Sequence, residues 1–260
     1  MKLLFSLLGL FVFSAGPVYY TQVVYTAPVT SDIIKTDDLY RYKGDSLDII
    51  YTFWADGGAM AFMVLNKSNT PLYIDWTKSA YADKKVTESY YPVYRNGTNL
   101  SEVADIYKTP ADWYKLFNPY ILSGYEGSNA LAEEPVTLLP AKSYLFRGCY
   151  KILPETRFSV KKLKPQNIPL ISGMRESFPG WIMQGDSANV ALGFGNTITY
   201  ATQKDFSDAK IVNNRFYVWQ VLTFEDAYFD NYNKDNNSVN CPYHSDKRYF
   251  ISHLKISDFD

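Results

Sequence analysis

The feature of the sequence that most constrains its fold is a pair of apolar segments separated by a polar turn, within residues 60–79. In the first segment (60–65) both alternating sets of side chains are apolar, which predicts a strand covered on both faces. The turn (66–71) is rich in residues that hydrogen-bond their own backbone. In the second segment (72–77) large apolar residues alternate with more polar ones. We expect a β-hairpin at the centre of a sheet, with Asp75 facing solvent.

The same two-residue period recurs along the chain, and no long helical stripe accompanies it. Segments of this kind are 22–29, 46–54, 135–152, 189–202, 215–224 and 248–256. Pro140 divides residues 135–152 into two short strands. Helix is expected only at 109–117 and as one turn at 205–210. Many short strands with frequent turns predict a mainly β protein, an immunoglobulin-like β-sandwich that forms a single domain over residues 17–260.

The segment 215–224 is the longest of these apolar strands with clear alternation. One face is expected to carry Phe216, Val218 and Leu222, and the other face Tyr217, Trp219 and Val221. The two sets would then lie on opposite faces of one strand.

Residues 96–134 form a long excursion rich in Gly, Ser, Tyr and Asn. Excursions from a rigid sandwich often carry binding groups. Four aromatic residues there could stack on sugar rings and make a carbohydrate-binding module: Trp113, Tyr114, Tyr120 and Tyr125. The alternative is that these rings pin the excursion to the sheet.

The charge balance excludes one class of partner. Charged residues make up 20% of the 260 residues, and the net charge is -1. A chain of this kind has no electrostatic footprint for nucleic acid. Aromatic residues reach 17%, which favours strands.

The first sixteen residues, MKLLFSLLGLFVFSAG, have the layout of a secretory signal peptide. Lys2 precedes an apolar stretch from Leu3 to Phe13 that is short for a membrane span, and small residues follow. The alternatives are an uncleaved anchor or a buried N-terminal segment, and Pro17 is a poor first residue for a mature chain. No Cys follows the apolar stretch, so lipid attachment there is excluded. No second long apolar run predicts a membrane span. We expect export to the periplasm or the cell surface.

The chain contains two cysteines, Cys149 and Cys241. In an oxidising compartment they could form a disulfide, which would stabilise the fold by about 4–5 kcal/mol in the chain-entropy model. The alternative is two unrelated thiols, one of them buried on a strand.

Motifs for chemistry are weak. Gly185-Asp186-Ser187 resembles the nucleophile block of one esterase type, with His244 as base and Asp246 nearby, but the α/β pattern of that fold is missing. His244 and His253 have no metal-ligand spacing. Residues 230–236 are rich in oxygen ligands but lack the register of a calcium loop, and we expect an ordinary loop. The sequence predicts neither a cofactor nor enzymatic activity.

Several motifs resemble, in order, a family of uncharacterised exported proteins from Bacteroidetes. The matching stretches are IIYTFWADGGAMAFMVLNKSNTPLYIDWTKS, ESYYPVYRNG, VTLLPAKS and ITYATQKDFSDAKIVNNRFYVWQV. The resemblance covers most of residues 19–225 and implies an immunoglobulin-like sandwich in the cell envelope, without a known activity or catalytic residues. Many members resemble lipoproteins, whereas this chain lacks the lipid-bearing Cys. We therefore expect a non-catalytic binding or assembly module whose partner is a protein or glycan of the cell envelope.

Overall fold

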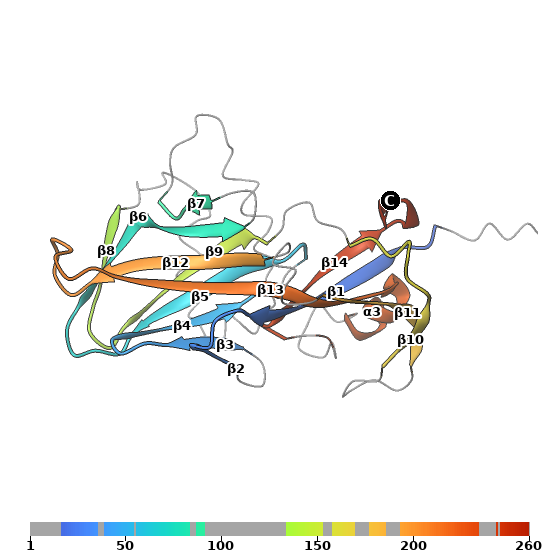
Figure 1. Cartoon of the computed structure of the whole chain (residues 1–260), viewed down its shortest axis with the longest axis horizontal. Coiled ribbons are helices and arrows are strands. Elements are labelled where there is room, and N and C mark those ends of the chain that lie inside the picture. The colour runs from blue at the N-terminus through green and yellow to red at the C-terminus, as the bar shows by residue number, and fades with distance from the viewer. Residues whose placement is uncertain are drawn as a thin grey trace, which may run out of the picture.

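The computed structural model describes residues 17–35, 39–54, 56–83, 87–91, 134–152, 158–169, 177–185, 193–233, 243 and 245–259. Within them the chain is mainly β, in two antiparallel sheets that pack face to face (Figure 1). This arrangement confirms the predicted mainly β sandwich. Among these residues no helix has the length and apolar character needed to cross a membrane.

The large sheet contains β1 (Tyr20–Pro28), β6 (Leu72–Asp83), β7 (Thr87–Ser89), β8 (Val136–Leu139), β10 (Gln166–Ile168), β11 (Phe178–Gln184), β12 (Gly193–Ala201), β13 (Lys210–Glu225) and β14 (Arg248–Leu254). The small sheet contains β2 (Ile33–Lys35), β3 (Tyr40–Lys43), β4 (Leu47–Thr52), β5 (Ala59–Asn66) and β9 (Tyr144–Lys151). An α-helix, α3 (Asp226–Asn233), follows β13, and the short 3-10 helix η5 (Ile256–Phe259) follows β14.

Strand β13 organises the large sheet. On one side its first half pairs with β12 and its second half with β11. On the other side its second half pairs with β1, which in turn pairs with β14. The first half of β13 therefore belongs to the sandwich, and the second half continues into an extension of the large sheet that carries α3 (Figure 1).

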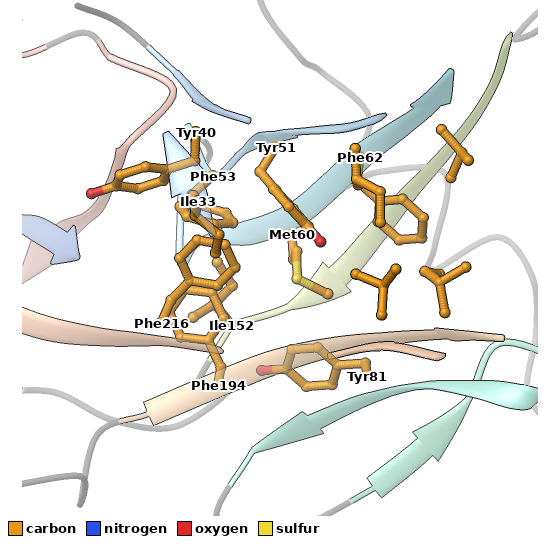
Figure 2. Packing of buried hydrophobic residues seen from close by; sticks show 14 of the residues in the cluster. Ile33, Tyr40, Tyr51, Phe53, Met60, Phe62, Tyr81, Ile152, Phe194 and Phe216 are labelled. Atoms are coloured by element: carbon orange, nitrogen blue, oxygen red, sulfur yellow. The ribbon is translucent and has the colours of Figure 1, made fainter. Parts of the chain in front are cut away.

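The core of the sandwich is built largely from aromatic rings. Phe53 packs edge to face against Phe194 and Phe216 of the large sheet, with ring centroids 5.1 and 5.0 Å apart. Tyr51 reaches Phe216 in the same manner at 5.0 Å. Figure 2 shows these rings together with Met60 between the strands of both sheets. Each such ring removes a large apolar area from water, so this cluster supplies much of the hydrophobic free energy that holds the sheets together.

A buried polar network crosses the same core. The hydroxyl oxygen of Tyr51 accepts hydrogen bonds from the side-chain amides of Asn196 and Asn214, at 2.9 and 2.6 Å. The hydroxyl of Tyr90 donates to Oδ1 of Asn196 at 2.7 Å. These side chains are at most 2% exposed, and burial raises the pKa of Tyr51 despite the two amide donors. Because buried polar groups need partners, the network fixes β4 against β12 and β13 in one register.

The predicted hairpin at residues 60–79 is wrong in one respect. The first segment is covered on both faces as expected, since Met60 and Phe62 are fully buried and Met63 is 8% exposed. However, β5 pairs with β4 and β9 in the small sheet, whereas β6 pairs with β12 in the large sheet. The turn between them is therefore an arch that crosses from one sheet to the other. Alternation of apolar residues defines the faces of a strand but not its neighbours.

A second arch packs against the first. Pro140 ends β8, as predicted, and the chain then crosses from the large sheet into β9 of the small sheet. Asn66 joins the two arches, because its side-chain nitrogen donates to the carbonyl oxygens of Leu139 and Pro140 at 3.1 and 2.9 Å. The ammonium group of Lys142 donates to the carbonyl oxygen of Lys67 at 2.6 Å. The two turns form one hydrogen-bonded cap at this end of the sandwich.

The solvent-facing position expected for Asp75 is wrong. Asp75 is 5% exposed, because four residues of β6 (76–79) stand opposite a single residue of β12 and the strand folds back over the carboxylate. Its Oδ1 accepts hydrogen bonds from the backbone and hydroxyl of Thr77 at 3.0 and 2.5 Å. Burial alone would raise the pKa of Asp75, but these bonds and the neighbouring Lys78 outweigh it, and the pKa lies below its ordinary value.

Two local predictions are also corrected. Residues 230–233, expected as loop, belong to α3, which starts at Asp226 directly after β13. Residues 205–210 form turns and the start of β13 rather than a helical turn. The carboxylate of Asp208 accepts hydrogen bonds from the backbone of Thr202 and Gln203, which closes a wide loop instead of a helix.

Candidate functional site

A β-bulge in β13 distinguishes one part of the large sheet. Tyr25 lies opposite Gln220 and Thr26 lies opposite Val218, so Trp219 is an extra residue on β13. A bulge of this kind turns two successive side chains toward the same side of a sheet, and bulges are common next to functional sites. The ring of Trp219 contacts the ring of Tyr25, and Gln220 is the direct cross-strand neighbour of Tyr25. The side chains of Trp219 and Gln220 therefore lie on the face that carries Tyr25.

The bulge also corrects the predicted faces of residues 215–224. Val221 joins Phe216 and Val218 in the sandwich core, whereas Leu222 belongs to a second core with Phe224. The sequence carries a signal for this change that was not used. In an uninterrupted strand Gln220 would share the core face with Phe216 and Val218, and a polar side chain in that series is a reason to expect a break.

The side chains around the bulge form a continuous surface, which we call the bulge platform. It consists of Tyr25, Gln184, Trp219, Gln220 and Arg248. Four of them are direct cross-strand neighbours in a single row over four strands, in the order Gln184, Gln220, Tyr25 and Arg248. Because opposed residues of paired strands share a face, the row presents two amides, an aromatic ring and a guanidinium on one surface.

The geometry of the aromatic pair is well defined. The rings of Tyr25 and Trp219 meet at 75° with centroids 5.7 Å apart. The guanidinium carbon of Arg248 lies 4.3 Å from the centroid of the Tyr25 ring, in a cation–π contact. Arg248 also donates a hydrogen bond to the carbonyl oxygen of Tyr243 at 3.2 Å, which holds the guanidinium in place.

Gln184 is an exposed member of the platform, and Trp219 is its exposed aromatic residue. The side chain of Trp219 is 37% exposed, and within the described part of the chain its indole N–H has no hydrogen-bond partner. The backbone beneath it is fixed, because the N–H of Gly185 donates to the carbonyl oxygen of Trp219 at 2.7 Å. A Cβ at Gly185 would lie 2.7 Å from the carbonyl oxygen of Val218, so only glycine permits this close approach. The platform therefore offers a flat ring, a free donor and flanking polar groups on a rigid support.

A second polar cluster lies where α3 begins. Asp226 is 8% exposed and accepts hydrogen bonds from the hydroxyl of Thr21 at 2.6 Å and from the backbone N–H of His253 at 3.2 Å, and Nδ1 of His253 lies 2.9 Å from its Oδ2. His253 has a φ of 56°, an uncommon value for a residue with a side chain. The cluster ties β1, α3 and β14 together.

Several predicted site residues lie outside the described residues. They are the aromatic residues predicted to bind sugar, namely Trp113, Tyr114, Tyr120 and Tyr125, together with Ser187, His244, Cys241 and the predicted signal segment 1–16. Cys149 lies in β9, and the predicted disulfide stays a prediction. Asp246 is described, and its Oδ1 accepts a hydrogen bond from the hydroxyl of Thr52 at 2.6 Å. The described residues contain no group of three or more acidic, Cys or His side chains placed to hold a metal ion.

Comparison with known proteins gives no further guide, since no family model, curated protein or solved structure matches this chain. The resemblance to exported proteins of Bacteroidetes therefore stays an expectation from the sequence motifs.

Proposed function

We propose that the protein is an exported, non-catalytic binding module of the bacterial cell envelope, and that its ligand is a glycan held on the bulge platform. Export follows from the layout of residues 1–16 and from the family resemblance. The sequence alone suggested the aromatic residues of the excursion as a sugar-binding surface. We propose the bulge platform in their place, because its rings are fixed on a sheet.

The observation that carries this proposal is the exposed ring of Trp219, whose N–H has no partner among the described residues, flanked by Gln220 and by Arg248 on Tyr25. A sugar presents apolar C–H groups on the faces of its ring and hydroxyl groups around its rim. An indole face suits the first, while amide and guanidinium groups suit the second. Because β13, β1 and β14 hold these groups through sheet hydrogen bonds, binding requires little ordering of the protein.

The test is binding of soluble polysaccharides to the secreted protein, by affinity gel electrophoresis and calorimetry. Trp219→Ala should weaken binding by about tenfold or more, which corresponds to ~1.4 kcal/mol. The matched control is Tyr144→Ala, an exposed aromatic (44%) on β9 of the other sheet, which should leave binding unchanged. Equal binding by wild type and Trp219→Ala would refute the platform as the site.

Two further variants separate the alternatives. Loss of binding in Trp113→Ala or Tyr120→Ala, with Trp219→Ala unaffected, would place the sugar on the excursion instead. Fractionation of cells expressing the full chain tests the export part independently, since we expect the protein in the periplasm or at the surface and retention in the cytosol would contradict it.

A further inference from the structure

One edge of the large sheet is open along the first half of β13. Residues 210–217 pair with β12 on one side, but β1 covers the other side only from Phe216 onward. The chain leaves the sheet after Pro28 and enters β2 of the small sheet at Ile33. Residues 210–214 are consequently without a second neighbour among the described residues, over about 17 Å at ~3.4 Å per residue.

The backbone groups that face this edge can be assigned. The carbonyl oxygen of Arg215 accepts a hydrogen bond from Val29, on the side of β1, while the carbonyl oxygen of Asn214 faces Gly195 of β12. Since alternate residues of a strand direct their polar groups to the same side, those of Ile211 and Asn213 face the open edge. Neither residue forms a hydrogen bond there with any part of the chain that the structure describes.

The side chains along the edge have a distinct chemistry. Ile211 is 69% exposed, and Val29 and Ile34, which lie on the connection and on β2, are 54% and 42% exposed. Ile211 thus lies between two exposed cations, Lys210 and Arg215, which form no ion pair with a described residue.

We propose that this edge accepts an extended strand of a partner protein, apolar in the middle and acidic at one or both ends. The strand would continue the line of β1, antiparallel to β13, and would pair with the backbone of Ile211 and Asn213. Addition of a strand to an open sheet edge is a common mode of peptide recognition, in which the backbone provides affinity and side chains provide selectivity.

The charges decide between a partner protein and a second copy of this chain. Antiparallel pairing of two copies about Val212 would place the Lys210 and Arg215 side chains of both copies along one short edge. Exposed cations on an edge strand are a known protection against self-association. The same cations attract carboxylates of an incoming strand, so the edge is selective for an acidic partner.

A fluorescein-labelled peptide of sequence Thr-Thr-Val-Ile-Glu-Glu, acetylated and amidated at its ends, is a suitable probe in an anisotropy titration against the full-length protein. We expect saturable binding that weakens with salt, and no binding of the peptide in which both glutamates are replaced by lysine. Absence of binding by the acidic peptide, or equal binding of both peptides, would overturn the proposal.

A pair of variants at Asn213 tests the backbone contact. Its N–H faces the open edge, so Asn213→Pro removes that donor without breaking the ladder to β12, and Asn213→Ala keeps it. Peptide affinity should fall about tenfold or more in the first variant and stay unchanged in the second. Unchanged affinity in a folded Asn213→Pro variant would refute the strand-addition geometry.

A second test does not depend on the proline variant folding. Lys210→Glu combined with Arg215→Glu should reverse the preference, so that the lysine peptide binds and the glutamate peptide does not. A wild-type dimer in light scattering that Asn213→Pro dissociates would show that a second copy occupies the edge, which contradicts the proposal. Trp219→Ala should bind the peptide normally, so failure of the glycan proposal leaves this result unaffected.

Discussion

Replacement of Asn66 should destabilise the protein more than any other single polar substitution at the double arch. Asn66 is fully buried, and its side-chain nitrogen donates to the carbonyl oxygens of Thr70, Leu139 and Pro140 at 2.9, 3.1 and 2.9 Å. Its Oδ1 accepts hydrogen bonds from the backbone and the hydroxyl of Ser68 at 2.9 and 2.7 Å. One side chain therefore satisfies backbone groups of both arches.

The magnitude follows from the number of partners. Each hydrogen bond contributes about 1 kcal/mol net, and a buried carbonyl left without a donor costs about 1–3 kcal/mol. Loss of the Asn66 side chain removes the only side-chain donor that joins the two arches through Leu139 and Pro140 among the described residues. Asn66→Ala should thus lower the free energy of unfolding by roughly 3–5 kcal/mol, a large part of the ~5–15 kcal/mol typical of a domain.

Asn66→Asp sharpens the test because it has nearly the same shape. A carboxylate would face three carbonyl oxygens without a donor, so this variant should be at least as unstable as Asn66→Ala. Equilibrium urea unfolding is the assay, with a midpoint lowered by roughly 1 M or more. Asn213→Ala, at an exposed position on β13, is the control and should stay within about 0.5 kcal/mol of wild type. A loss below about 1 kcal/mol in Asn66→Ala would refute the role of the double arch.

Three further predictions concern titratable side chains. The pKa of Asp75 is lowered, so its contribution to stability is complete above the ordinary aspartate pKa and is lost as pH falls through the folded pKa. In urea unfolding, the difference in stability between wild type and Asp75→Asn should therefore disappear in acid. Tyr51→Phe should lower the free energy of unfolding in urea by about 2–3 kcal/mol, because two amides lose their acceptor. Tyr249→Phe is the control and should lower it by less than about 1 kcal/mol, because that buried hydroxyl has no partner among the described residues. Burial raises the pKa of Tyr40 to about 12, so the contribution of Tyr40 to stability is complete below about pH 10 and is lost as pH rises through about 12. Alkaline unfolding, followed by circular dichroism, should therefore be less steep in Tyr40→Phe.

The sequence was informative about strands and much less about their partners. Period-two alternation placed β5, β6 and β13 correctly because burial of one face is a property of each strand alone. The arch at Asn66 was read as a hairpin because an Asn-rich turn looks the same whether the next strand pairs or crosses to the other sheet. Only the contact of Asn66 with the carbonyl oxygens of Leu139 and Pro140, more than seventy residues away, distinguishes the two.

The candidate site illustrates a similar limit. Trp219 was visible as an aromatic residue of a strand, but its exposure depends on a bulge that exists only when Tyr25 pairs with Gln220. Arg248 reaches Tyr25 from a strand near the other end of the chain. A surface assembled from four strands that are distant in sequence is not encoded in any local pattern, whereas the aromatic residues of the segment 96–134 stand close together in the sequence.

The pairing of β1 with β13 has a consequence for how the chain matures. Tyr20 lies opposite Glu225, so β1 completes its pairing with β13 only after residue 225 has been synthesised. Closing so large a loop is entropically costly, and folds dominated by such distant pairings form slowly. If the protein is exported as proposed, this slow closure would keep the nascent polypeptide unfolded long enough to be threaded through a translocation channel.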